Sequence, residues 1–302
     1  MHLQKNYYFK QKVPQIQASL TNNYKHKKYD NIQSLDSFTE ALSRDIYTVA
    51  RDRHIYFRRK TFSNGSAKTD LRLIDNSLNQ GIKDVKVLEG NVGYLELTEM
   101  GDFENNQDLV ASVFTFLQNT QGLIIDIRKN GGGSYSRLIT SYLIPEDSMH
   151  LITYIWNNGE HDSIFTYKKL MAPRYLNKPV YILTSAKTFS SAEEFVYDLK
   201  ALKRIRIVGE KTKGGANPNQ IFKVFEAPNQ FTVSISIPIG TVVNTITKAN
   251  WEGEGIMPDI EITPEKAFPK AYVELLKTLQ GTPATEKINF KDLIENINKE
   301  LL

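Results

Sequence analysis

One stretch of this chain decides how it folds: TSAKTFSSAEEF, residues 184–195. The apolar run before it, residues 180–183, predicts a buried strand, and the spacing of apolar residues after it predicts a helix. Ser190 therefore falls at a strand-to-helix junction, where free N–H groups and the helix dipole favour negative charge. Two interpretations follow. Ser190 is a nucleophile, or it only caps the helix in a capping box with Glu193.

The composition is that of an ordinary globular protein and does not indicate a nucleic-acid partner. The chain has 302 residues, 40% hydrophobic and 24% charged, enough for one large or two modest domains. Its net charge of +4 is mild and its basic residues are scattered, so the sequence does not predict nucleic-acid binding. The absence of cysteine excludes disulfides, thiolate metal sites and a cysteine nucleophile.

The sequence shows no pattern typical of a targeting segment, a membrane-spanning helix, a metal site or a cofactor site. The first residues lack the apolar core of a signal peptide, and no run reaches the roughly 18 apolar residues of a membrane-spanning helix. The five histidines show no metal-ligand spacing, so no metal is predicted. No phosphate-binding or dinucleotide fingerprint occurs, and no cofactor is predicted.

The order of apolar patterns predicts an α/β protein with a helical beginning. Strand and helix patterns alternate between residues 85 and 208, which is typical of a sheet covered by helices. A polar stretch over 61–80 is the best candidate for a linker. The remaining predictions are a helical region to about residue 60, a strand at 55–57, β-patterned segments at 221–225 and 231–239, and helices at about 264–279 and 290–301.

Three other features could serve a serine nucleophile, and each also has a plain structural explanation. The glycines at 131–133 follow a predicted buried strand and could offer N–H groups to an oxyanion, form an ordinary turn, or hold a phosphate. His54 follows an apolar helix and could be a general base or a surface histidine. Glu252 lies among glycines, where turn chemistry is the default.

Together these features resemble one family. The chain is similar to the serine peptidases of the C-terminal processing protease and tricorn superfamily, in the branch with interphotoreceptor retinoid-binding protein modules and their bacterial relatives. The resemblance runs from about residue 30 to 275. It rests on five motifs in the family's order: Asp52-x-His54, Asp126-Ile127-Arg128-x-Asn130-Gly131-Gly132-Gly133, Thr184-Ser185-x-x-Thr188-Phe189-Ser190-x-x-Glu193-Glu194-Phe195, Gly209-Glu210-x-Thr212-x-Gly214-Gly215-Ala216-x-Pro218 and Trp251-Glu252-Gly253-x-Gly255-Ile256-x-Pro258-Asp259.

The resemblance implies a fold class and a division of the chain. The fold would be α/β, with a core of repeated β-β-α units like that of crotonase and Clp-type proteases, after a small N-terminal helical subdomain. The implied regions are 1–80, which carries the histidine and the linker, the peptidase core at 81–280, and a C-terminal helix at 281–302.

The resemblance also implies a mechanism, hydrolysis of peptide bonds, possibly near protein C-termini, through an acyl-enzyme. Ser190 would be the nucleophile, with His54 as its base and Glu252 supporting the histidine. The oxyanion would be held by the N–H groups of Gly132 and Ser191. Asp52, Arg128 and Glu193 are the supporting candidates.

The chain departs from the family pattern at three places. Gly215 stands where processing proteases carry a catalytic lysine, which removes lysine as the base. Arg53 stands where tricorn has a serine, so the coupling of Glu252 to His54 is open. Only about 40 residues separate His54 from Gly93, too few for the PDZ domain that usually tethers substrate.

Two other functions are compatible with such a fold. The retinoid-binding relatives bind lipophilic molecules without catalysis, which makes a ligand-binding module the alternative to a peptidase. Acyl-CoA chemistry on a crotonase-like fold would share the oxyanion site, but it does not explain the set of Ser190, His54 and Glu252. Family analogy also suggests export to a periplasm or cell surface.

Overall fold

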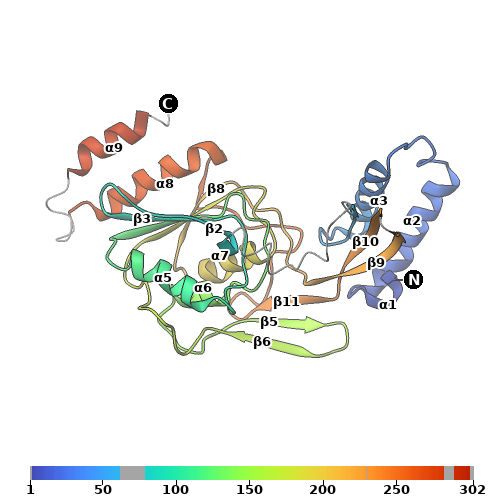
Figure 1. Ribbon diagram of the computed structural model, residues 1–302, viewed down its shortest axis with the longest axis horizontal. Helices are drawn as coiled ribbons and strands as arrows, with labels where there is room; N and C mark the ends of the chain where they lie inside the picture. The colour runs from blue at the N-terminus through green and yellow to red at the C-terminus, as the bar shows by residue number, and fades with distance from the viewer. Residues whose placement is uncertain (1, 62–78, 229, 282–288, 300–302) are drawn as a thin grey trace. The chain divides into compact units, whose positions relative to one another are not determined.

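The computed structural model describes residues 2–61, 79–228, 230–281 and 289–299 (Figure 1). Contacts divide the chain into two compact units, each assembled from separated stretches. The first contains residues 1–69, 153–163 and 215–243, and the second contains residues 70–152, 164–214 and 244–302. Most of the predicted linker at 61–80 lies outside the described residues.

The second unit is built on a six-stranded sheet of order β12-β8-β7-β4-β3-β2. Neighbouring strands from β12 to β3 pair in parallel, and β2 joins β3 as an antiparallel hairpin. The strands at its centre are apolar and fully buried, as expected of a parallel sheet covered on both faces. Their bounds are β2 Ile82–Leu88, β3 Val92–Leu97, β4 Gly122–Asp126, β7 Val180–Thr184, β8 Arg206–Gly209 and β12 Ile260–Glu261.

Helices cover both faces of this sheet. α8 (Pro264–Leu279) packs against β4, β7 and β8, and its buried side chains share a cluster with Tyr181 and Leu183 of β7. Figure 1 shows α5 (Gln107–Leu117), α6 (Arg137–Ser141) and α7 (Ser191–Ala201) on the opposite side. α9 (Phe290–Asn298) packs on α8. The alternation of strand and helix predicted from the sequence is therefore confirmed.

In its described residues, the first unit joins α-helices of the N-terminal region to a small antiparallel sheet of order β1-β10-β9. Strand β1 (Tyr56–Thr61) pairs with β10 (Phe231–Pro238), which also pairs with β9 (Asn219–Ala227). Ile235 and Ile237 of β10 share a core cluster with Ile16 and Ile46 of the helices. The helices are α1 (His2–Asn6), α2 (Val13–Lys25) and α3 (Leu35–Ala50).

In a third sheet, of order β11-β5-β6, each strand contains one of the points where the chain passes from one unit to the other. Its strands are β5 (His150–Trp156), β6 (His161–Phe165) and β11 (Gly240–Asn244). Strand β1 of the N-terminal region pairs with β10, so the compact unit that contains this region also includes residues 215–243. Among the described residues, no helix has the length and apolar character needed to cross a bilayer.

Candidate active site

Ser190 lies in a sharp strand–turn–helix connection. β7 ends at Thr184, and α7 begins at Ser191. The turn between them is fastened to the end of the neighbouring strand β4. Thr188 donates its hydroxyl to the Ile127 carbonyl at 2.9 Å, and the Phe189 N–H donates to the Asn130 carbonyl at 3.1 Å. The turn of the serine and the turn of the glycines are thus held side by side.

The backbone of Ser190 is strained. Its φ of 57° and ψ of −127° lie in a region that side-chain-bearing residues rarely adopt. Such a conformation costs on the order of 1–3 kcal/mol, persists only where the surroundings enforce it, and clusters at functional sites. A strained serine between a strand and a helix is also the geometry that exposes the nucleophile in α/β-hydrolases. A helix cap needs no such strain, because cap residues normally have β-region dihedrals.

Glu193 explains how the strain is maintained. Its side chain is fully buried, and Oε2 accepts the Ser190 N–H at 3.0 Å. Its other oxygen accepts the hydroxyl of Thr212 at 2.5 Å and the N–H of Gly214 at 2.7 Å. The capping box predicted for Ser190 and Glu193 is therefore present, and this carboxylate forms one half of it. The same group also ties the serine turn to residues 212–214.

Gly132 lies directly against the serine turn. Its φ is +98°, and a Cβ added to it would lie 2.7 Å from Ser190 Cβ and 3.2 Å from the Ser191 nitrogen. The Gly132 N–H donates to Asn130 Oδ1 at 2.9 Å. The sequence did not predict this bond. The bond occupies the Gly132 N–H, which is one of the two predicted oxyanion donors.

Glu252 follows the buried Trp251 in a turn of the same unit. Asn250 Oδ1 accepts the Glu252 N–H at 3.0 Å. The next residue, Gly253, donates its N–H to the Gly214 carbonyl at 3.2 Å. Because Gly214 also donates to Glu193, hydrogen bonds run from the Ser190 turn through Gly214 to the Glu252 turn.

Arg128 acts as a brace at the end of β4. Its guanidinium donates to both carboxylate oxygens of Asp126, at 2.9 and 2.5 Å, and to the Pro264 carbonyl. Asp126 also accepts the Tyr94 hydroxyl at 2.9 Å. The hydrogen bonds to Asp126 raise the pKa of Arg128. Arg128 therefore fixes the strand end from which the glycine turn starts.

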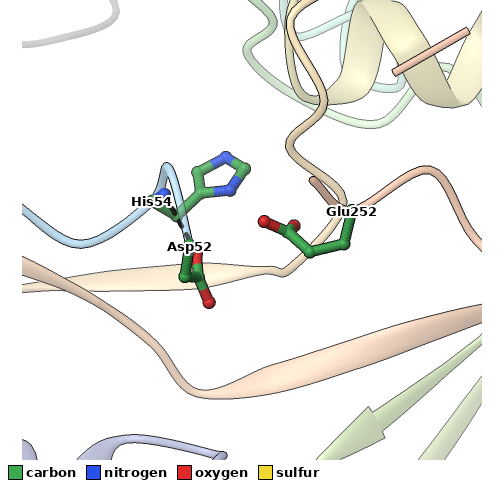
Figure 2. A group of neighbouring side chains, drawn as sticks. All are labelled: Asp52, His54 and Glu252. Carbon is green, nitrogen blue, oxygen red and sulfur yellow. Dashed lines mark hydrogen bonds between the residues drawn. The ribbon is translucent and has the colours of Figure 1, made fainter. Parts of the chain in front are cut away.

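His54 belongs to the first unit and follows the left-handed C-cap of α3 at Arg51. Asp52 Oδ1 accepts the His54 N–H at 3.0 Å, as Figure 2 shows. Both side chains are buried, at 1% and 3% exposure. Burial raises the pKa of Asp52, while the hydrogen bonds it accepts act in the opposite direction. Asp52 thus shapes the backbone of the turn that presents His54.

Two residues that the sequence did not single out complete this turn. Asn217 donates its amide to Asp52 Oδ2 at 3.0 Å, and the Tyr7 hydroxyl donates to the same oxygen at 3.4 Å. Tyr7 precedes Asp52 by 45 residues and Asn217 follows it by 165, so no local pattern connects them. Arg53 lies with its guanidinium 4.8 Å from the centre of the Tyr47 ring.

The predicted site residues therefore fall into two groups, one in each unit. The second unit contains Ser190, Ser191, Gly132, Arg128, Glu193 and Glu252. Hydrogen bonds connect the turns of Ser190 and Glu252 through Glu193 and Gly214, and Gly132 lies against the serine turn. Asp52 and His54 lie in the first unit with Tyr7 and Asn217.

Comparison with known proteins shows the family. Residues 91–262 match peptidase family S41, and residues 1–80 match the N-terminal domain of peptidase S41 in eukaryotic IRBP. The first match covers more than half of the chain, and the chain belongs to peptidase family S41. The resemblance to tricorn-like and retinoid-binding-protein-like members, and the α/β fold expected from it, are confirmed.

Individual relatives are distant. The tricorn protease of Thermoplasma volcanium is 24% identical over 73% of this chain and 22% of its own length. The nisin-resistance protein of Lactococcus lactis is 25% identical over 66% of this chain and 65% of its own length. A lipoprotein from Streptococcus agalactiae has a similar fold, with a TM-score of 0.58 at 16% identity over 91% of this chain and 93% of that one. The chain spans less than two thirds of either sequence relative.

Proposed function

We propose that this protein is a serine peptidase that cleaves peptide bonds through an acyl-enzyme at Ser190. The observation that carries this proposal is the strained backbone of Ser190, held by Glu193 and lying against Gly132. Membership of family S41 supports the same reaction.

The first step follows from these groups. Ser190 Oγ attacks the carbonyl carbon of the scissile bond while His54 accepts the hydroxyl proton, and Glu252 stabilises the imidazolium. The negative charge that develops on the carbonyl oxygen is held by the N–H groups of Ser191 and Gly132. The Gly132 N–H must exchange its bond to Asn130 Oδ1 for one to the substrate.

The second step regenerates the enzyme. The tetrahedral intermediate collapses, the C–N bond breaks, and the amine leaves with the proton from His54. Water, deprotonated by His54, then attacks the ester carbonyl. The bond from the acyl carbon to Ser190 Oγ breaks, Oγ takes the proton back from His54, and the new carboxyl terminus is released. Each step uses only groups of this chain and the two substrates, peptide and water.

Substitutions at the two relay residues test this mechanism. Replacing His54 with alanine removes the general base and should lower kcat/KM by about 10²–10⁴-fold. Glu252→Gln keeps the shape of the side chain but removes its charge. We expect a smaller loss of kcat/KM than in His54→Ala, because the imidazolium of His54 is then less stabilised. Digests of a peptide mixture, analysed by mass spectrometry, give both rates. Nisin, itself a peptide, belongs in that mixture because a relative is named for resistance to it.

The alternative function has a distinct outcome. A lipophilic-ligand-binding module would cleave nothing and would carry a stoichiometric lipid in native mass spectrometry of the protein as purified. Wild-type protein that is inactive on every peptide and carries such a ligand would contradict the peptidase proposal.

A further inference from the structure

Helix α7 carries Ser190 at its start and holds a second segment, residues 244–251, farther along. Asp198 Oδ1 accepts the side-chain amide of Asn244 at 2.8 Å. One residue earlier, the Tyr197 and Thr247 hydroxyls are hydrogen-bonded at 3.0 Å. The Tyr197 ring also contacts the Trp251 ring, with centroids 5.0 Å apart. Helix α7 therefore contacts this segment at its beginning, its middle and its end.

Asn244 organises the turn inside the segment. Its Oδ1 accepts the N–H groups of Ile246 and Thr247 at 2.9 and 3.0 Å. Its own N–H donates to the Ala249 carbonyl at 3.0 Å. Asn244 is 1% exposed, so water cannot replace these partners at low cost. One buried side chain thus fixes the turn and attaches it to α7.

The segment leads directly to Glu252. Trp251 is buried against Tyr197, and the Glu252 N–H is bonded to Asn250 Oδ1 at 3.0 Å. The same helix that begins after the strained serine therefore sets the position of the Glu252 backbone, and all of these contacts lie within the second unit.

We propose that Asp198 and Asn244 are positioning residues that hold Glu252 at a fixed place relative to Ser190, with α7 as their common frame. This inference rests on the proposed function, since it assigns a purpose to the placement of Glu252. Neither residue touches the reacting atoms. They act through the turn between Asn244 and Glu252.

Asp198 is a buried hydrogen-bond acceptor in acidic surroundings. Asp198 is 1% exposed, and Glu194, one turn earlier on α7, is also buried. Burial and the neighbouring Glu194 carboxylate raise the pKa of Asp198 well above its ordinary value. Glu194 itself accepts the Ser136 hydroxyl at 3.1 Å. Asp198 accepts from Asn244 through one carboxyl oxygen, and the amide oxygen of an asparagine at position 198 could accept in the same way.

A double-mutant cycle tests the role. We expect Asn244→Ala to lower kcat/KM by about tenfold or more, because Glu252 loses its fixed position. In a Glu252→Gln background the same substitution should cost twofold or less, because the charge to be positioned is already gone. Equal losses in the two backgrounds would overturn the inference, and so would no loss in the wild type. Asn296→Ala on α9 is the matched control and should change neither rate.

A swap of the two side chains keeps the test sharp if Asn244→Ala folds poorly. Asn244→Asp alone places two carboxyl groups opposite each other and should lower both the melting temperature and kcat/KM. Adding Asp198→Asn restores one amide and one carboxylate, and we expect both quantities to return to within about threefold or a few degrees of wild type. A double variant as impaired as Asn244→Asp would contradict the positioning role of Asp198 and Asn244.

These outcomes separate the inference from the proposed function. If Glu252→Gln alone hydrolyses peptides at the wild-type rate, the relay in the proposed function is wrong. If Glu252→Gln is impaired and the Asn244 loss is additive to it, the relay stands and the positioning role is wrong.

Discussion

Replacing Ser190 with alanine is expected to lower kcat/KM for peptide hydrolysis by about 10⁴-fold or more. The hydroxyl is the attacking group, and no neighbouring side chain of the turn can take its place in the same geometry. Initial rates on a cleaved peptide, measured beside the circular dichroism and melting temperature of the variant, give the result.

Ser191 offers the matched control. It follows Ser190 directly, and the mechanism uses only its backbone N–H, which alanine keeps. Ser191→Ala should therefore retain kcat/KM to within about threefold. If activity survives in Ser190→Ala and disappears in Ser191→Ala, the nucleophile is Ser191 and its assignment to Ser190 is wrong.

Adding one methyl group at Gly132 should be nearly as damaging. The new Cβ would lie 2.7 Å from Ser190 Cβ and 2.9 Å from the Phe189 carbonyl oxygen, at a φ of +98°. Either the serine turn or the glycine turn must move, and displacement of an oxyanion donor costs about 10²–10³-fold in kcat. We expect kcat to fall by at least that factor, with a lower melting temperature.

The neighbouring glycine separates this effect from a general effect of glycine substitution. A Cβ at Gly131 meets nothing within 4 Å. Gly131→Ala should therefore keep kcat to within a fewfold and the melting temperature to within a few degrees. Similar losses in the two variants would show that the contact between Gly132 and Ser190 is not what matters.

The serine turn could be predicted because its signals are local. The apolar run of β7, Ser190 and Glu193 lie within fourteen residues of one another, so strand, turn and helix follow from spacing alone. The helix predicted at 264–279 matches α8 for the same reason, since its apolar stripe and Pro264 define it without help from the rest of the chain.

Contacts between distant residues could not be predicted in this way. β1 pairs with β10 about 180 residues later along the chain, with Tyr56 opposite Ser236. The bonds of Asp52 to Tyr7 and Asn217 depend on that arrangement. No pattern in the sequence marks Asp198 among the polar residues of its helix. Its burial and its bond to the buried Asn244 show that it faces inward.

The bond between the Gly132 N–H and Asn130 shows a different limit. A glycine triplet after a buried strand predicts donors for an oxyanion, and the structure places Gly132 against the serine turn. The partner of the Gly132 N–H in the resting protein depends on the rotamer of the Asn130 side chain. Spacing carries no information about that.

The most direct test of the central claim is covalent labelling of the intact protein with a fluorophosphonate, followed by digestion and mass spectrometry. An activated serine forms a stable adduct with this probe, whereas a helix cap does not. The account predicts one adduct per chain, on the peptide that contains Ser190, and its loss in Ser190→Ala. No adduct between neutral and alkaline pH, or an adduct on another residue, would contradict it.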